Sequence, residues 1–441
     1  MHDWFDELAG WLRIPSISAD PAHAGDVRTA GEWLCELVRG VGGDCELIDW
    51  RGQPLAIGEL RASSDPAGAP TVVCYGHFDV QPPDPLGLWS SDPFEPEIRD
   101  GRLYGRGVAD DKGQLYMLLA AARGLVRAGS LPVNVRFACD GEEETGGHSI
   151  LEFLEDDGRG ADAAVIFDSG MIAPGRPAFD VATRGMAYFH LTLRTGERDL
   201  HSGMFGGAAL NAAHALVCTL APLLASDGRL AEPLRAGIAP PAPEELEGWR
   251  SLPGGARKLA DQGATPADAR AQEDFYLRTF AEPALDVNGI ETGSPHLQKT
   301  VLPSEASANV SIRLAPGQDP ETIARAFERL ARDAAPAGAQ LDITLLSSAP
   351  PGLVAPDAPA IRLGLDAFQR VLGMRPALIR SGGTLPIVPT LSGLGIPSII
   401  TGFALPDSNL HAPDECLRAD YVDRGISAAR ELFVSLAALR A

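Results

Sequence analysis

The sequence predicts an α/β protein with two domains, and three observations lead to this prediction. Apolar strand-like runs alternate with amphipathic helical stretches up to residue 183, and the same pattern returns after residue 350. Between them, residues 184–349 contain half-exposed alternating strands and are typical of an α+β insertion. The length of 441 residues is enough for two ordinary cores. We therefore expect a discontinuous α/β domain with a mixed sheet (1–183 and 350–441), interrupted by an α+β domain (184–349).

Periodicity locates the elements of the first expected domain. Apolar residues at helical spacing predict helices over residues 3–13, Thr29–Val38, Lys112–Val126 and Gly147–Leu154. Apolar runs predict strands over Glu46–Ile57, Thr71–Tyr75, Val133–Cys139 and Ala163–Phe167. After the insertion, a helix is expected over Ile361–Val371, and an apolar run covers Ile396–Thr401.

The insertion has its own pattern of elements. Strands are predicted over Ala187–Arg194, Glu305–Leu314 and Leu341–Leu346, and helices over Ala208–Leu224 and Pro320–Ala331. The stretch Gly237–Pro283 is rich in Pro, Glu and Ala, so it is expected to form surface helices and loops.

The composition argues against several kinds of partner. The formal net charge of −22 lacks the basic footprint that nucleic acid or an anionic membrane surface requires. No run approaches the ~18–20 apolar residues of a membrane span, and the acidic start of the chain is unlike a secretion signal. The six cysteines are scattered without a Cys-x-x-Cys pair, which is typical of reduced thiols. We therefore expect a cytoplasmic protein with no nucleic-acid or membrane partner.

The first polar motif follows the predicted strand Thr71–Tyr75. His77 and Asp79 lie at its carboxyl end, where ligands bind in open α/β sheets. Alternation points both side chains the same way, so the carboxylate can orient the imidazole, as at many metal sites. The alternative is a capped turn with a surface histidine.

Two acidic motifs have a similar placement. Asp110 and Asp111 end a glycine-rich turn before a predicted helix, where an aspartate can also serve only as a cap. The glycines do not form the phosphate-binding pattern Gly-x-x-x-x-Gly-Lys-Ser/Thr. Glu142, Glu143 and Glu144 lie between a buried strand and a Gly-Gly turn, although such a run is often only a solvated charge cluster. At a hydrolytic site, one glutamate would bind metal and another would act as the general base.

Two residues later in the chain complete the set. Asp168 follows the strand Ala163–Phe167, and His411 lies in a polar loop after the run that ends at Thr401. Each of them alone is typical of an ordinary loop residue. Four strand ends that together supply His, Asp and Glu predict a metal site, and this mixed ligation suits zinc, manganese or cobalt. A bridging carboxylate would hold two ions about 3.5–4 Å apart.

Together, these motifs resemble those of one known family. Gly-His-x-Asp-Val-Gln-Pro, Gly-Arg-Gly-x-x-Asp-Asp-Lys-Gly, Glu-Glu-Thr-Gly and a late Asn-x-His match the carnosinase/cytosolic nonspecific dipeptidase family. That family belongs to a wider group of two-metal peptidases with aminoacylases and succinyl-diaminopimelate desuccinylases. The match runs from Gly76 to Glu415. It implies a two-domain metallopeptidase whose α/β catalytic domain is interrupted by a lid and dimerisation domain.

The resemblance implies that five side chains bind two divalent ions per subunit. His77 and Asp168 would bind one ion, Glu144 and His411 would bind the other, and Asp110 would bridge them. Zn²⁺ is the expected metal, with Mn²⁺ and Co²⁺ as alternatives.

The resemblance also implies roles for residues around the metals. Asp79 would orient His77, Glu143 would be the general base, and the Asp110–Asp111 peptide bond would be cis. The match of Glu-Glu-Thr-Gly places Glu142 outside the metal ligands, although three glutamates in a row allow the assignment to slip by one.

Further residues are implied in the insertion and in a later glycine loop. The Asp-Leu-His-Ser-Gly motif implies that His201 reaches the partner subunit's active site and stabilises the oxyanion, so a homodimer through the lid domain is expected. From the residues alone, His201 could equally be a turn histidine. Arg313 would receive the substrate's C-terminal carboxylate, for which a strand-edge salt bridge is the alternative. Gly383 and Thr384 would line the substrate's terminus.

The implied reaction is hydrolysis of a peptide bond in a dipeptide or short peptide. A water that bridges the metals would lose its proton to Glu143 and attack the carbonyl. An N-acyl amino acid amidohydrolase or deacylase would share the metals and differ in its substrate pocket. A catalytically silent binding protein on the same fold would be expected to lack a ligand or the base. Neither a Gly-x-Ser-x-Gly elbow nor a His-Glu-x-x-His helix is present, which disfavours a serine hydrolase and a single-zinc protease.

Overall fold

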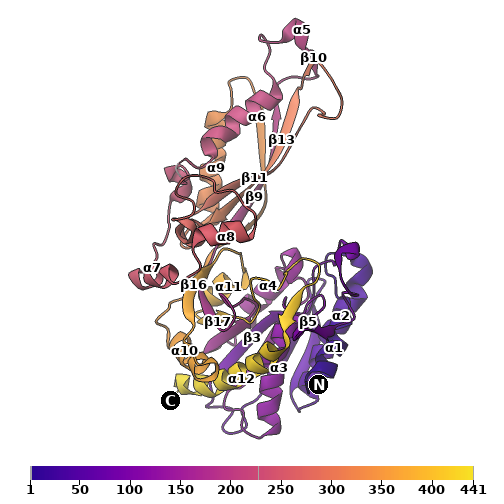
Figure 1. The fold of residues 1–441 in the computed structure, drawn as a ribbon, viewed down its shortest axis with the longest axis vertical. Helices are drawn as coiled ribbons and strands as arrows, with labels where there is room; N and C mark the ends of the chain where they lie inside the picture. The colour runs from indigo at the N-terminus through magenta and orange to yellow at the C-terminus, as the bar shows by residue number, and fades with distance from the viewer. Residues whose placement is uncertain (1, 227, 441) are drawn as a thin grey trace. The chain divides into compact units, whose positions relative to one another are not determined.

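The computed structural model describes residues 2–226 and 228–440. They form two compact units, and Figure 1 shows their elements. The first unit contains the chain up to Val181, the segment Val354–Ile379 and the chain from Thr390 onward. The second unit contains Ala182–Leu353 and Arg380–Pro389.

The segment Arg380–Pro389 lies outside the predicted insertion, yet it clusters with the second unit. Two contacts within that unit hold it. Arg380 donates to both carboxylate oxygens of the buried Glu245, at 2.7 and 3.0 Å. Arg313 donates to Thr384 Oγ1 at 2.9 Å. A late segment of the chain is therefore part of the unit formed by the insertion.

The first unit is built on a mixed sheet. Its strand order is β1 (Asp44–Trp50), β2 (Gln53–Leu60), β6 (Asn134–Asp140), β3 (Thr71–His77), β7 (Ala163–Phe167), β17 (Ser398–Thr401) and β8 (Ala178–Thr183). The central strands β6, β3, β7 and β17 run parallel, whereas β1, β2 and β8 are antiparallel to their neighbours. Because the carboxyl ends of parallel strands share one edge, the segments that follow these four strands meet there.

Helices pack against this sheet and against one another. They are α1 (Phe5–Leu12), α2 (Ala24–Arg39), α3 (Lys112–Arg127), α4 (Ser149–Asp157), α10 (Pro359–Leu372) and α12 (Ala419–Leu436). The predicted apolar side of α3 is buried, and α3 contacts β3 and β7. In Figure 1, α12 lies beside α3, and it also contacts α10. A small sheet joins β18 (Cys416–Arg418), β5 (Arg102–Tyr104) and β4 (Glu97–Arg99).

The prediction of one strand over Glu46–Ile57 is wrong. The segment belongs to a hairpin in which β1 pairs with β2 and Trp50 lies opposite Gln53. The two residues between them, Arg51 and Gly52, have φ values of +50° and +90°. Two consecutive left-handed residues are typical of a tight type I′ turn, which matches the twist of antiparallel strands.

The second unit is built on an antiparallel sheet with the order β11 (Ala284–Thr292), β13 (Glu305–Leu314), β9 (Gly185–Arg194) and β14 (Gln340–Ala349). Alternate residues of β9 are buried, as its sequence pattern predicts. The helices α6 (Ala212–Leu220) and α9 (Pro320–Ala334) contact this sheet and one another. Phe189 and Phe327 stack in the shared core with ring centroids 4.3 Å apart.

Short elements complete both units. They are β10 (Leu200–His201), α5 (Ser202–Phe205), α7 (Pro243–Arg250), α8 (Gly255–Asp261), β12 (Val301–Leu302), β15 (Gly352–Leu353), β16 (Ala377–Ser381) and α11 (Ile387–Gly393). Helix α6 is shorter than the predicted Ala208–Leu224, because the Asn211 side chain caps it by accepting from the N–H groups of Ala213 and His214. Within the described residues, no helix is both long and apolar enough to cross a membrane.

Candidate active site

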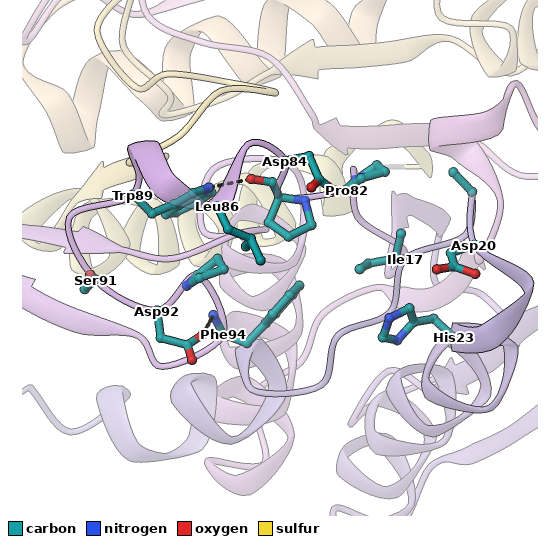
Figure 2. A pocket seen from close by; sticks show the side chains of 13 residues that line it. Ile17, Asp20, His23, Pro82, Asp84, Leu86, Trp89, Ser91, Asp92 and Phe94 are labelled. Carbon is teal, nitrogen blue, oxygen red and sulfur yellow. Dashed lines mark hydrogen bonds between the residues drawn. The ribbon is translucent and has the colours of Figure 1, made fainter.

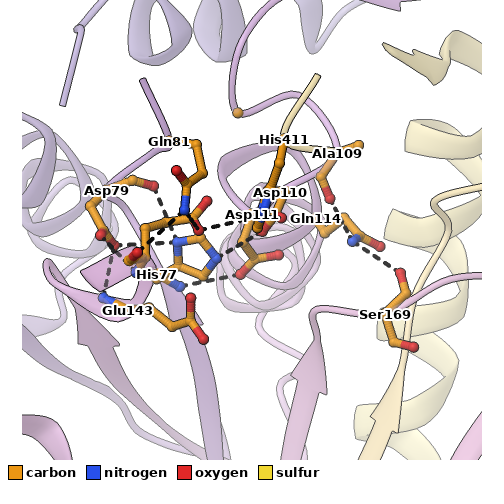
Figure 3. A network of polar contacts seen from close by, with 12 residues as sticks. His77, Asp79, Gln81, Ala109, Asp110, Asp111, Gln114, Glu143, Ser169 and His411 are labelled. Atoms are coloured by element: carbon orange, nitrogen blue, oxygen red, sulfur yellow. Dashed lines mark hydrogen bonds and ion pairs between the residues drawn. The ribbon is translucent and has the colours of Figure 1, made fainter. Parts of the chain in front are cut away.

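The carboxyl end of β3 carries the first two predicted site residues. His77 ends the strand, and both His77 and Asp79 are fully buried. The imidazole Nδ1 lies 3.1 Å from the backbone oxygen and 3.3 Å from Oδ1 of Asp79. Gly76 makes room for the Asp111 side chain beside His77, because a Cβ at residue 76 would lie 2.5 Å from Oδ2 of Asp111. The imidazole is thus held from its Nδ1 side, and Nε2 faces Asp110 (Figure 3).

The paired aspartates lie in the loop that precedes α3. The peptide bond between Asp110 and Asp111 is cis, as the resemblance implies. The Asp110 carboxylate lies between two imidazoles, with Oδ1 3.0 Å from His77 Nε2 and Oδ2 2.9 Å from His411 Nε2. Asp111 is fully buried and accepts a hydrogen bond from the His77 N–H at 3.2 Å. Asp110 therefore links two histidines that are distant in sequence.

A buried glutamate that the sequence did not single out, Glu415, holds the same loop. Its carboxylate accepts from Arg106 Nη1 at 2.6 Å. It also accepts from three backbone N–H groups, those of Gly107 (3.0 Å), Ala109 (2.8 Å) and Asp110 (3.1 Å). Because Glu415 follows His411 by only four residues, it ties the His411 loop to the Asp110 loop.

The three successive glutamates have different surroundings. Glu142 Oε1 accepts from two backbone N–H groups at the start of α4, at 3.0 and 3.2 Å. The backbone N–H groups of Glu143 and Glu144 donate to the two carboxylate oxygens of Asp79, at 3.3 and 3.1 Å. Asp79 therefore orients both His77 and the segment that carries the predicted base.

Glu144 and Asp168 extend the cluster. Glu144 Oε2 accepts from Gln81 Nε2 at 2.9 Å and lies 3.2 Å from His411 Nε2. Gln81 belongs to the Gly-His-x-Asp-Val-Gln-Pro motif, so its position in that motif could have indicated a role. Asp168 directly follows β7 at the same edge of the sheet and is half-buried.

The donor atoms form a candidate metal site. One ligand atom from each of His77, Asp110 and Glu144 lies within 4.8 Å of the others. His411 contacts two of these carboxylates, and Oδ1 of the buried Asp111 has no hydrogen-bond partner among residues 2–226 and 228–440. Mixed imidazole and carboxylate donors fit divalent zinc, manganese or cobalt.

The electrostatics of the cluster also favour a bound cation. Burial, followed by the charge of Asp111, raises the pKa of Asp168 well above its usual value. Burial raises the pKa of Glu143 to about 7, against the opposing effect of His77. For Asp110 burial acts in the same direction, but hydrogen bonds from His411 and His77 outweigh it and hold the pKa below its ordinary range. Several carboxylates that lie together and are at least partly buried would be stabilised by divalent ions.

The remaining predicted residues belong to the second unit. His201 is exposed, and its Nδ1 accepts a hydrogen bond from the Gly203 N–H at 3.0 Å. Arg313 and Thr384 are brought together by their 2.9 Å hydrogen bond. Gly383 is exposed at the same loop.

Arg184 is a further cation near Arg313 that the sequence analysis did not assign. Its backbone N–H donates to the oxygen of Gly383 at 3.0 Å, and its Nε donates to the oxygen of Gly382 at 3.2 Å. Burial, followed by the charge of Arg313, lowers the pKa of Arg184 to about 10. The Arg184 guanidinium therefore stays charged at neutral pH, and its repulsion by Arg313 favours an anionic ligand beside the two side chains.

A separate hollow of about 900 Å³ lies in the first unit (Figure 2). Trp89, Phe94 and Leu86 supply its apolar lining, and Trp89 Nε1 donates to the oxygen of Pro83 at 2.6 Å. None of the predicted site residues lines it. Pro82, which does line it, directly follows Gln81, so the hollow adjoins the segment that contacts Glu144.

Comparisons with known proteins agree with this fold and cluster. The model of peptidase family M20/M25/M40 matches residues 73–435. A cysteinylglycine-S-conjugate dipeptidase from Corynebacterium striatum is 28% identical over 449 residues, covering 98% of this chain and 95% of that protein. The human Beta-Ala-His dipeptidase is 28% identical over 401 residues, covering 88% and 78%. The solved M20 family metallo-carboxypeptidase Sso-CP2 from Sulfolobus solfataricus has a TM-score of 0.87 and 26% identity, covering 99% and 100%.

The α/β fold and these matches define the protein as a metallopeptidase, an enzyme that hydrolyses peptide bonds. The family model covers most of the chain, so the chain belongs to peptidase family M20/M25/M40. The predicted α/β fold class and the resemblance to carnosinase-like metallopeptidases are both confirmed. The role of each site residue stays a prediction.

Replacement of Asp79 by asparagine is expected to weaken metal binding and activity on the order of 10–100-fold, as is usual for groups that orient metal ligands. The amide keeps the size of the side chain but places an NH₂ group against His77 Nδ1 or against the N–H groups of Glu143 and Glu144. Metal affinity of the apo-protein should be measured by competition with a coloured chelator. Wild-type affinity in the variant would contradict the role of Asp79.

Proposed function

We propose that this enzyme is a two-metal dipeptidase that hydrolyses dipeptides or short peptides. Two relatives that support this are named for dipeptide substrates. The observation that carries the proposal is the meeting of His77, Asp110, Glu144 and His411 at one edge of the sheet, with Glu143 in the same cluster (Figure 3). This arrangement combines ligands for metal with a carboxylate that is free to move a proton.

The five predicted ligands divide between two ions. His77 and Asp168 would hold one, Glu144 and His411 would hold the other, and Asp110 would bridge them. When bound, the ions polarise the scissile carbonyl and lower the pKa of the attacking water. We propose Zn²⁺ as the native ion, with Mn²⁺ and Co²⁺ as alternatives that fit the same donors.

The side chains around the metals move the proton and hold the ligands. Glu143 takes the proton from the attacking water and returns it to the leaving amine, and a pKa near 7 suits both steps. Asp79 accepts a hydrogen bond from the Nδ1–H group of His77, which leaves the lone pair of Nε2 for the metal. His201 would reach the active site of the partner subunit and donate a hydrogen bond to the oxyanion there.

The substrate's C-terminal carboxylate is proposed to bind in the second unit. Arg313 and Arg184 supply two positive charges, and Thr384 supplies a hydroxyl beside Arg313. A guanidinium can bind a carboxylate through two parallel hydrogen bonds. Gly383 provides backbone without a side chain at the same loop. The enzyme would therefore require a free C-terminus.

Replacement of Arg313 by methionine is expected to lower kcat/KM for a dipeptide by roughly 10–100-fold, the worth of one charge-assisted hydrogen bond or somewhat more. The loss should appear mainly in KM, because Arg313 contacts a part of the substrate that does not react. For the same dipeptide with a C-terminal amide, the kcat/KM of Arg313→Met should be close to that of the wild type. Arg194→Met, an exposed arginine of β9 paired with Glu305, is the control. Equal losses for acid and amide would refute carboxylate binding at Arg313.

We also propose a homodimer formed through the second unit. Apolar side chains are exposed there on several elements and loops: Met204, Phe205, Leu210, Val217, Leu297, Leu345 and Leu346. Light scattering after gel filtration should give twice the chain mass of 46.4 kDa. Val217→Asp on α6 should shift the protein toward the monomer. A monomeric wild-type protein would refute the proposal.

A cytoplasmic location of the enzyme stays a prediction.

One experiment tests the substrate class and the metal together. Protein stripped with a chelator and restored with Zn²⁺ or Mn²⁺ should be assayed against dipeptides and N-acyl amino acids. Metal-dependent cleavage of dipeptides is the expected result. Cleavage of N-acyl amino acids alone would instead identify an amidohydrolase with the same centre. No cleavage by protein that binds two metals would favour a binding protein on this fold.

A further inference from the structure

The first turn of α3 contains a buried amide that the proposed chemistry does not use. Gln114 has only 1% of its surface exposed, and both ends of its amide are hydrogen-bonded. Its Nε2 donates to the backbone oxygens of Ala109 at 2.8 Å and Ser169 at 3.2 Å. Its Oε1 accepts from the backbone N–H of Phe403 at 2.6 Å. Figure 3 shows Gln114 between Ala109 and Ser169.

The three backbone partners belong to three different segments, and each segment carries a predicted metal ligand. Ala109 directly precedes Asp110, and Ser169 directly follows Asp168. Phe403 is the second residue of the segment that leaves β17 and leads to His411. One side chain thus joins the loops that follow β7 and β17 to the loop that precedes α3.

At this point the backbones of the segments lie so close together that there is little space between them for a side chain. A Cβ at Gly402 would lie 1.9 Å from the Ser169 oxygen and 2.6 Å from Gln114 Oε1, so only glycine fits there. The loops after β7 and β17 are also bonded directly, since the Met171 N–H donates to the Ala404 oxygen at 2.7 Å. A change in the length or polarity of residue 114 would therefore shift backbone and not only side chains.

The chemistry of the position requires an amide. Two carbonyl oxygens need a donor and one N–H needs an acceptor, and glutamine supplies both from one planar group. Leucine would remove the hydrogen bonds that Gln114 makes to these three backbone groups, two of which are buried. An ionised glutamate would face the Ala109 and Ser169 oxygens with acceptors only.

We propose that Gln114 is a positioning residue of the metal centre, one that fixes the relative placement of the segments bearing Asp110, Asp168 and His411. This inference rests on the proposed two-metal function. It assigns Gln114 no contact with metal or substrate. Its effect passes through the backbone of the three segments that hold the ligands.

The test compares two buried glutamines that make the same kind of contacts. Gln318, in the second unit, is 3% exposed, accepts from the Ala315 N–H at 2.8 Å, and donates to the oxygens of Leu234 and Ala236 at 3.0 Å. Gln114→Leu and Gln318→Leu therefore remove the same kinds of hydrogen bond to the backbone. Each apo-protein should be titrated with Zn²⁺ and with Mn²⁺ in competition with a coloured chelator, and its thermal unfolding should be followed.

Both variants are expected to unfold at a lower temperature than the wild type. Only Gln114→Leu should lose metal affinity, on the order of 10–100-fold, with a parallel fall in kcat at saturating metal and a smaller change in KM. Gln114→Asn keeps the amide but shortens its reach, so it should show a smaller loss in the same direction. If Gln114→Leu does not fold, the metal affinity of Gln114→Asn tests the inference in its place.

Wild-type metal affinity in Gln114→Leu, or in Gln114→Asn if only that variant folds, would overturn the inference and leave Gln114 as a structural amide. Equal losses of affinity in the Gln114 and Gln318 variants would overturn it as well. A wild-type protein that binds no metal would instead overturn the proposed function. The affinity measurement needs no substrate, so the two failures are distinguishable.

Discussion

Replacement of Glu143 by glutamine is expected to lower kcat by about 10²–10⁴-fold, the usual contribution of a general acid–base group, while the metal content stays unchanged. Glutamine has the size of glutamate but cannot accept the proton of the attacking water. The fold should tolerate the change, because the contact of residue 143 with Asp79 uses the backbone N–H and not the side chain. Activity should be measured at saturating metal, and metal content by elemental analysis of the purified protein.

Glu142 offers a matched control in the adjacent position. Its carboxylate accepts from the N–H groups that begin α4, so Glu142→Gln should reduce stability slightly and leave kcat unchanged. The pair of variants also resolves which of the successive glutamates is the base. If Glu143→Gln kept a near-normal kcat, the proposed proton transfer would be wrong.

Replacement of Asp110 by asparagine is expected to have a comparably large effect for a different reason. Asp110 is the one predicted ligand that both ions would share, and each of its oxygens already faces an imidazole, His77 or His411. The neutral amide removes the shared negative charge, so both ions should be held less tightly. We expect metal content to fall below two ions per chain and kcat to fall by at least about 10²–10³-fold.

Metal content and circular dichroism of the Asp110→Asn protein should be recorded together, so that ligand loss is separated from unfolding. Asp414→Asn is the control, because Asp414 lies in the His411 loop and contacts Ser90 instead of the cluster. Two ions bound with wild-type affinity in Asp110→Asn would refute the bridging role.

The helices and buried strands follow from local pattern where one face of the segment is buried. The predicted helix Lys112–Val126 begins at the same residue as α3 and ends one residue before it does. The predicted strand Glu305–Leu314 coincides with β13. In both elements, the periodicity of the apolar residues indicates which side faces the core. The hairpin within Glu46–Ile57 was not predicted, although Arg51 and Gly52 interrupt its apolar pattern, because the turn depends on two left-handed residues and one of them is not glycine.

The candidate site was predictable to the extent that its residues stand at strand ends within motifs. His77, Glu144 and His411 come together because the parallel strands β3, β6 and β17 expose their carboxyl ends at one edge, and Asp110 contacts both histidines from the loop before α3. The local pattern does not separate the three glutamates, and only the family motif places Glu142 outside the metal ligands. Only the fold shows that Glu142 caps α4.

The sequence alone determined the α/β class, the motif residues of the candidate site and the family resemblance, because these depend on residue type and short-range order. The tertiary structure alone revealed Arg184 beside Arg313, and Glu415 and Gln114 as the side chains that join distant loops. Their partners are backbone groups or charges far away in the chain. Hydrogen bonds to the backbone carry no sequence signature, because every residue offers the same carbonyl and, except for proline, the same N–H.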